Sequence, residues 1–102
     1  MTSREVSQGE QRQGVDEQII YTLTTTNWGA SPTTVSVVAK DMTNNELDVS
    51  TTVLSGSASV NGNIITLPIL KSLTEDHRYR VEVKFTSGTS IFEAYFYVLA
   101  EL

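Results

Sequence analysis

His77 is the single histidine of this chain and the side chain best suited to proton transfer near neutral pH. A catalytic triad or a histidine metal site would need it beside an oriented nucleophile or beside further ligands. Asp76 is its neighbour in sequence, but consecutive residues of a strand point to opposite faces. The sequence therefore favours a surface corner residue at position 77, and it predicts no catalytic residue and no enzyme.

Oxygen-bearing side chains gather in one polar loop, at Asp41, Asn44, Asn45, Glu46 and Asp48. Ca²⁺ takes about six to eight oxygen ligands, so a structural calcium ion is one interpretation of the loop. Asp and Asn are also good turn formers, and the spacing matches no established calcium loop. A plain turn is the favoured interpretation, and the calcium ion stays open.

The remaining candidates for chemistry are weaker. Glu75 and Asp76 are adjacent carboxylates, but glycoside cleavage needs two carboxylates that converge across a cleft. Gly56 and Gly62 fit hairpin turns and lack the following helix and lysine of a phosphate-binding loop. We therefore expect no cofactor and no catalytic metal.

Composition limits the partners. The 102 residues suit one domain, and the absence of cysteine excludes disulfides and thiolate metal sites. The formal net charge is −5, with seven basic residues among twelve acidic ones, which argues against nucleic acid as a partner. No apolar run approaches the roughly 20 residues that span a bilayer, and the N-terminus lacks the apolar region of a secretory signal, so we expect no membrane partner.

Residues 1–15 are polar, and Val6 is the only sizeable apolar side chain before position 15 besides Met1. Such a segment buries too little surface to offset its ordering entropy, so alone it should be disordered. It is predicted to be a flexible arm, or an arm ordered by a neighbouring subunit. Residues 16–102 are predicted to form the folded domain.

The stretch from His77 to Leu102 predicts the central hairpin of that domain, because both of its runs alternate apolar and polar residues. The inward faces would be Tyr79, Val81, Val83 and Phe85 on one strand and Phe92, Ala94, Phe96 and Val98 on the other. Only an even loop keeps both sets on one side of the sheet. A Ser87-Gly88 turn would place Val83 opposite Phe92, and a four-residue loop would place Phe85 there.

Five further runs predict strands: 16–28, 34–41, 48–54, 57–60 and 64–69. Asn61-Gly62-Asn63 predicts a hairpin turn, and a Gly62-Asn63 turn with Val60 opposite Ile65 is preferred. Pro68 lacks a backbone donor, so its strand should end there or lie at an edge. The only expected helical turn covers 71–76. About seven strands with turns every 8–12 residues or so predict an all-β antiparallel sandwich.

The segment LTEDHRYRVEV, with Leu73 six residues before Tyr79, resembles the tyrosine corner of immunoglobulin-like and fibronectin type III sandwiches. In those domains a Tyr near the start of the sixth strand bonds back to the backbone of the corner. Trp28 departs from the pattern, because it lies at a turn before Pro32 and has no cysteine pair to pack on.

A second resemblance spans most of 19–99. The matching pieces are NWG with SP at 27–32, DVSTTVLSG at 48–56, ITLP at 65–68 and KSLT at 71–74. Together they resemble small structural proteins of tailed bacteriophages, of the fibre–tail adaptor, neck or head accessory type. The resemblance implies a virion protein assembled in the host cytoplasm, without catalysis, that binds other virion proteins and copies of itself. The favoured role is fibre attachment at the neck or tail, and the alternative role is capsid decoration or cementing.

Candidate interface residues follow from the outward faces. If Phe96 points inward, Tyr95, Tyr97 and Glu93 point outward, and exposed aromatics are enriched in contact cores. The competing interpretation is that the tyrosines cover the sheet or pack on the arm. Trp28 and Val6 complete the set. An exposed Trp28 beside Asn44-Asn45 would instead suit a carbohydrate- or surface-binding module.

Overall fold

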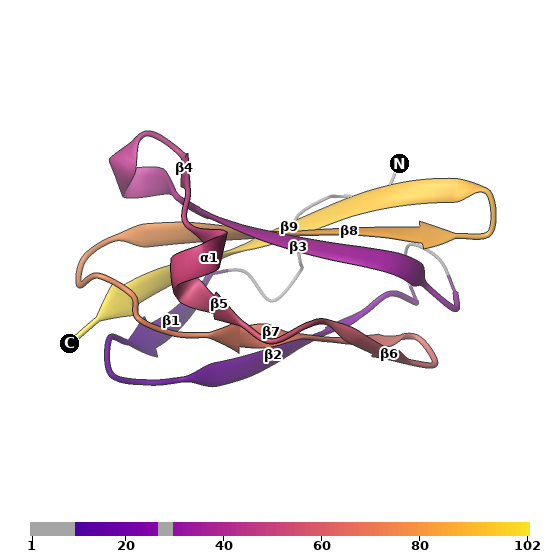
Figure 1. Ribbon diagram of the computed structural model, residues 1–102, viewed down its shortest axis with the longest axis horizontal. Helices are drawn as coiled ribbons and strands as arrows, with labels where there is room; N and C mark the ends of the chain where they lie inside the picture. Colours follow the sequence, from indigo (N-terminus) through magenta and orange to yellow (C-terminus); the bar gives the residue numbers. More distant parts are fainter. Residues whose placement is uncertain (1–9, 27–29) are drawn as a thin grey trace.

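The computed structural model describes residues 10–26 and 30–102, which form two β-sheets packed face to face (Figure 1). Sheet A has the strand order β1-β9-β8-β3-β4, and sheet B has the order β2-β7-β5, with β6 also paired to β7. The strands are β1 (Gln11–Gly14), β2 (Ile19–Thr24), β3 (Thr33–Asp41), β4 (Leu47–Asp48), β5 (Leu54–Ser55), β6 (Ser59–Asn61), β7 (Ile64–Leu70), β8 (Arg78–Ser87) and β9 (Ser90–Glu101). Helix in the described ranges is limited to η1 (Met42–Asn44) and α1 (Ser50–Val53), neither of which could cross a membrane. The predicted all-β sandwich is confirmed at this level.

The β8–β9 hairpin lies at the centre of sheet A, and its predicted even register is confirmed. The loop is Gly88 and Thr89, so the predicted Ser87-Gly88 turn is wrong. Ser87 pairs with Ser90, and Phe85 pairs with Phe92 as in the four-residue alternative. Both predicted apolar faces turn inward: the four side chains of β8 are buried, as are Ala94, Phe96 and Val98 of β9, while Phe92 at the hairpin end is half-buried.

The β6–β7 hairpin also has the preferred register, with Val60 opposite Ile65 and Gly62-Asn63 in the turn. Gly62 and Gly88 each occupy the first loop position, with φ of 62° and 61°. Tight hairpin turns that match strand twist require a positive φ at that position, which glycine adopts without steric cost.

Pro68 does not end its strand, contrary to the sequence prediction, because β7 continues to Leu70 between β2 and β5. The pairing with β2 shifts register between Ile20 and Thr22, opposite this position. On the other side of β7, the pairing with β6 ends at Thr66, and the pairing with β5 begins at Ile69. The missing N–H of proline therefore lies where neither neighbour continues the regular ladder, as at a bulge.

The strand predicted over 48–54 is wrong. The segment runs instead through the end of β4, then α1, then the start of β5, and the predicted helical turn at 71–76 is absent. Asp48 explains the helix, because its carboxylate accepts hydrogen bonds from the Ser50 backbone N (3.0 Å) and Oγ (2.6 Å). Such local side-chain bonds compete with a strand ladder, and they lower the pKa of Asp48.

Ser50→Ala should destabilise the protein by about 1–3 kcal/mol. Ser50 Oγ accepts the backbone N–H of Ala39 (2.9 Å), so the substitution leaves that β3 donor and the Asp48 carboxylate each short of a partner. Because the hydrogen bonds lower the folded-state pKa of Asp48, their contribution is present above the ordinary aspartate pKa and is lost as pH falls through the folded value. Urea unfolding should therefore show a gap between wild type and variant at neutral pH that narrows in acid. A constant gap at all pH values would contradict this role for Asp48.

The corner before β8 is held by Tyr79. Its hydroxyl accepts a hydrogen bond from the backbone N of Thr74 (2.8 Å), while its ring and Leu73 are buried in the core. This hydrogen bond from the backbone to the tyrosine hydroxyl is the one that the tyrosine-corner pattern predicts. It fixes the angle at which the chain crosses from sheet B to sheet A.

The domain begins earlier than position 16, because β1 pairs in parallel with the end of β9, from Gln11 opposite Val98 to Gly14 opposite Glu101. Gln13 explains why this polar stretch is ordered. Its side chain is fully buried and its Nε2 donates to the carbonyl oxygens of Leu70 (2.7 Å) and Glu17 (3.0 Å). Its Oε1 accepts from the Tyr21 hydroxyl (3.1 Å), and burial, then the charge of Glu17, raise the pKa of Tyr21. One amide thus joins sheet A to sheet B.

Candidate functional site

The outer face of sheet A presents two tyrosines from β9 beside two arginines from the neighbouring strand β8. The rings of Tyr95 and Tyr97 meet edge to face at 5.6 Å between centroids. The Arg78 guanidinium lies 3.7 Å above the Tyr97 ring, and that of Arg80 lies 5.8 Å from the Tyr95 ring. Both tyrosines are half-buried, so their rings are held in place yet reach the surface. We call these four residues the Tyr–Arg cluster.

Carboxylates from three parts of the chain contact the arginines: Glu10 just before β1, Glu46 in the turn before β4, and Glu82 on β8 itself. Arg78 Nε lies 2.9 Å from Glu10, and Arg80 contacts Glu82 (2.7 Å) and Glu46 (3.2 Å). Burial acts to lower the pKa of Arg80, but hydrogen bonds to Tyr97 and Glu82 outweigh it and raise that pKa. The ion pairs hold both guanidinium groups in place, which lowers the entropy cost of using them in a contact.

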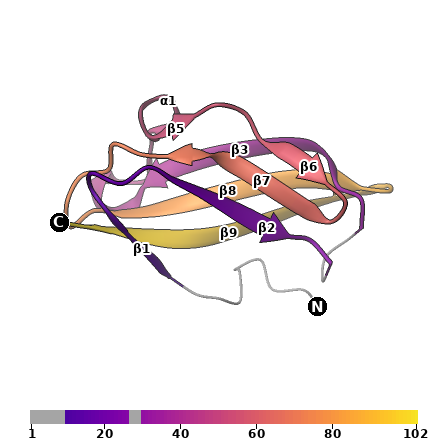
Figure 2. The ribbon, with the colours of Figure 1, turned by 90° about the horizontal axis from the view of Figure 1, so that it is seen from below.

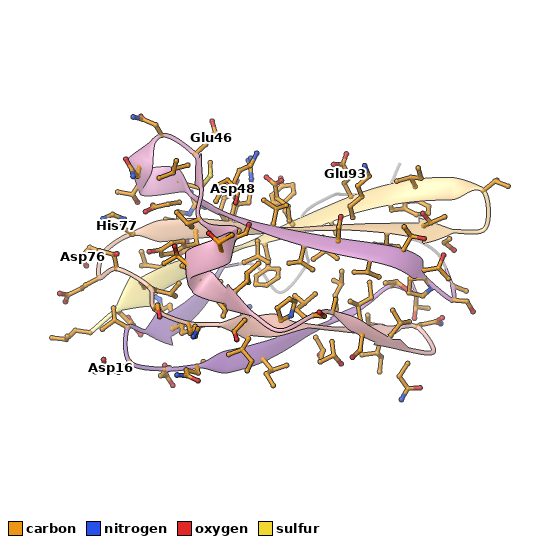
Figure 3. All side chains as sticks on the ribbon, viewed as in Figure 1. Asp16, Glu46, Asp48, Asp76, His77 and Glu93 are labelled. Carbon is orange, nitrogen blue, oxygen red and sulfur yellow. The ribbon has the colours of Figure 1, made fainter. Side chains whose placement is uncertain are left out.

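A shallow hollow of about 90 Å³ adjoins the Tyr–Arg cluster on the same face. Its lining comes from three strands: Ser36, Val38, Glu82, Val83, Lys84, Glu93 and Ala94. Glu93 stands opposite Lys84 in the β8–β9 register and points outward, on the same side as Glu46 in Figure 3. A hollow this small suits one protruding side chain of a partner better than a drug-sized ligand.

His77 has a partner that sequence reasoning missed. Its Nδ1 lies 2.7 Å from Asp41 Oδ2, although 36 positions separate the two residues. Asp41 is nearly buried and its Oδ1 also accepts the Thr43 backbone N–H (3.1 Å), so the pair ties the corner to the end of β3. Only the β3–β8 register, which sets Asp41 opposite Tyr79, brings them together.

The Asp41–Asp48 loop does not converge on one point. Asp41 is engaged by His77, Asp48 by Ser50 and Glu46 by Arg80. Across the described residues, no three His, Cys, Asp or Glu side chains are grouped as metal ligands would be. Each carboxylate is instead engaged by a different partner: Asp48 by its own turn, Asp41 by the corner before β8, and Glu46 by β8 itself.

Two of the sequence-predicted interface residues, Val6 and Trp28, lie outside the described residues. The structure brings together the other three, Tyr95, Tyr97 and Glu93, on one face. Sequence reasoning did not foresee the partnership of Arg78 and Arg80 with the tyrosines. Both arginines alternate with the inward residues Tyr79 and Val81 and so belong to the outer face, and a cross-strand pairing of Arg80 with Tyr97 could have revealed the contact.

Comparison with protein-family models, with curated proteins and with solved structures finds no match for this chain.

Proposed function

We propose that this chain is a non-enzymatic structural protein of a tailed-phage virion, located at the neck or tail, where it attaches a fibre by docking on neighbouring proteins. The single observation that carries the docking role is the Tyr–Arg cluster on the outer face of sheet A. Tyr and Arg are the residue types that dominate binding energy at protein contacts, above all where they are already ordered. The virion setting is supported by the sequence resemblance alone.

An immunoglobulin-like sandwich is the finer fold that we assign. Three observations support it: the β3-β8-β9 neighbours in sheet A, the β2–β7 pair opposite them, and the Tyr79 corner at the start of β8. Domains of this architecture commonly bind through a sheet face, an edge or the end loops. The partners we propose are other virion proteins and copies of this chain.

Tyr97→Ala should weaken binding to a neighbouring virion protein by roughly 10- to 100-fold, because it removes the ring under Arg78 and the edge contact of Tyr95. The measurement is calorimetric titration of the full chain against each protein encoded beside it. Thr22→Ala, on the outer face of sheet B, is the matched control and should bind as wild type does. Equal affinities for all three forms would remove the cluster from the mechanism.

The identity of the partner that binds separates the two virion roles. Binding to neck, tail or fibre proteins supports the adaptor. Binding to the major capsid protein alone supports a decoration or cement protein, which would use the same face.

A further inference from the structure

The two faces of the sandwich differ sharply in charge. The strands of sheet B come from two stretches, 18–39 and 49–70, that contain no Asp, Glu, Lys, Arg or His. By contrast, five of the six described basic residues project from the outer face of sheet A: Arg12, Lys40, Arg78, Arg80 and Lys84. The outer face of sheet B is therefore uncharged throughout.

Exposed aliphatic side chains mark the two ends of this uncharged face. Ile20 is 56% exposed and stands opposite Ile69, and at the other end Ile64 is 44% exposed beside the β6–β7 turn. Between them Thr22 pairs with Thr66, which in turn pairs with Ser59. Figure 2 shows β2, β7 and β6 in front of β8 and β9, with no other described element lying over them.

We infer that this face, named here the neutral face, is a self-docking surface whose occupant is the neutral face of a second copy of the chain. Burying a charge without a partner is costly, so an uncharged face accepts only another uncharged face at low cost. Among the described surfaces of this chain, the neutral face alone meets that condition. A twofold contact places the same patch on both copies, which a surface of Ile, Thr, Ser and Asn satisfies without matched charges.

The net charge leads to the same pairing. Two chains that each carry −5 repel one another, and a contact through the outer faces of sheet A would require charged side chains of both signs to be desolvated or matched. Contact through the neutral faces keeps the charged faces on opposite outer sides of the pair. This inference adds the surface for the self-association that the proposed function includes, and it leaves the Tyr–Arg cluster open for a different partner.

The size of the neutral face sets the strength of the self-association. Three strand positions at about 4.8 Å by seven residues at about 3.3 Å give roughly 350 Å² per copy. Stable dimers bury about 800 Å² per partner, so the contact is weak and operates where copies are held close together.

The test is a dilution series of the full-length chain from about 10 μM to about 1 mM, followed by sedimentation equilibrium and amide chemical shifts. We expect the average mass to rise with concentration and the shifts to move on β2, β6 and β7. Ile64→Glu and Ile20→Glu should each raise the dissociation constant about 10-fold or more, since each places like charges face to face. Added salt should strengthen the wild-type association, because it screens the repulsion between the two negative chains.

Leu47→Glu is the matched control, because it adds the same charge at a similarly exposed aliphatic residue (51%) on β4 of sheet A. It should associate as wild type does, and so should Tyr97→Ala, which separates this surface from the Tyr–Arg cluster. Circular dichroism of each variant verifies the fold. A monomer at every concentration, shifts confined to sheet A, or equal loss in Leu47→Glu and Ile64→Glu would overturn the inference.

Discussion

Gln13→Leu should destabilise the protein by about 2–4 kcal/mol, although glutamine lies in a segment whose composition predicts disorder. The leucine side chain has a similar size and is apolar, so it fills the same space. It offers nothing to the Leu70 and Glu17 carbonyls or to the Tyr21 hydroxyl, which the Gln13 amide now satisfies. A buried polar group left without a partner costs about 1–3 kcal/mol, and more than one is affected here.

Guanidinium unfolding at neutral pH measures the loss, and hydrogen exchange of the β1 and β9 amides locates it. Arg12→Ala is the control on the same strand, because Arg12 is exposed and its ion pair with Glu101 lies at the surface. Surface pairs contribute about 0–1 kcal/mol, so this variant should remain close to wild type. If Gln13→Leu were as stable as Arg12→Ala, β1 would not be anchored through its amide.

Phe85→Ala should cost about 3–5 kcal/mol, the largest effect that we expect from a single substitution. Phe85 is 0% exposed, and its ring stacks on Phe92 at 5.7 Å between centroids. Truncation removes both the buried ring and the support of its neighbour, and a close-packed core refills such a cavity only in part.

Phe92→Ala is the informative comparison, because the alternating pattern treats the two phenylalanines alike. Phe92 is half-buried at the end of the hairpin, where water can enter the vacated space. We expect it to cost about 1–2 kcal/mol, which follows from partial burial of its side chain. Thermal unfolding with calorimetry ranks the two variants, and equal losses would show that the hairpin end is packed as tightly as its centre.

Local patterns with long-range consequences were readable from the sequence. Alternation in β8 and β9 gave the inward faces, and turn chemistry gave the Gly62-Asn63 turn, because side-chain period and positive φ are local properties. The β8–β9 turn was placed one residue early, at Ser87-Gly88, because alternation requires an even loop but does not say which two residues form it. The Tyr79 corner was readable for the same reason, since its donor lies five residues away.

Features that depend on distant partners were not readable. In the sequence, Gln13 is one polar residue among several, because its acceptor, the Leu70 carbonyl oxygen, lies 57 positions away. The strand interpretation of 48–54 failed because β propensity describes a half-buried surface, whereas Asp48 and Ser50 satisfied the backbone locally. Pro68 was misread because its tolerance depends on gaps in two neighbouring strands.

For the candidate site, alternation identified the outward tyrosines, and cross-strand register supplied their arginines. The neutral face could not be predicted, because nine residues, Lys40 to Asp48, separate its two uncharged stretches in sequence and only sheet pairing brings them together.

The parallel pairing of β1 with β9 has a mechanical consequence. Tension that pulls the chain before Gln11 away from the chain after Glu101 draws these two strands along each other in opposite senses. The load then falls in shear on the whole β1–β9 ladder at once, including the bond from Val15 N to the Glu101 carbonyl (2.8 Å), and is not released one bond at a time. The Gln13 amide passes part of that load to Leu70 in the opposite sheet. The domain is thus built to resist stretching along its length, with the resistance concentrated in its first four-residue strand.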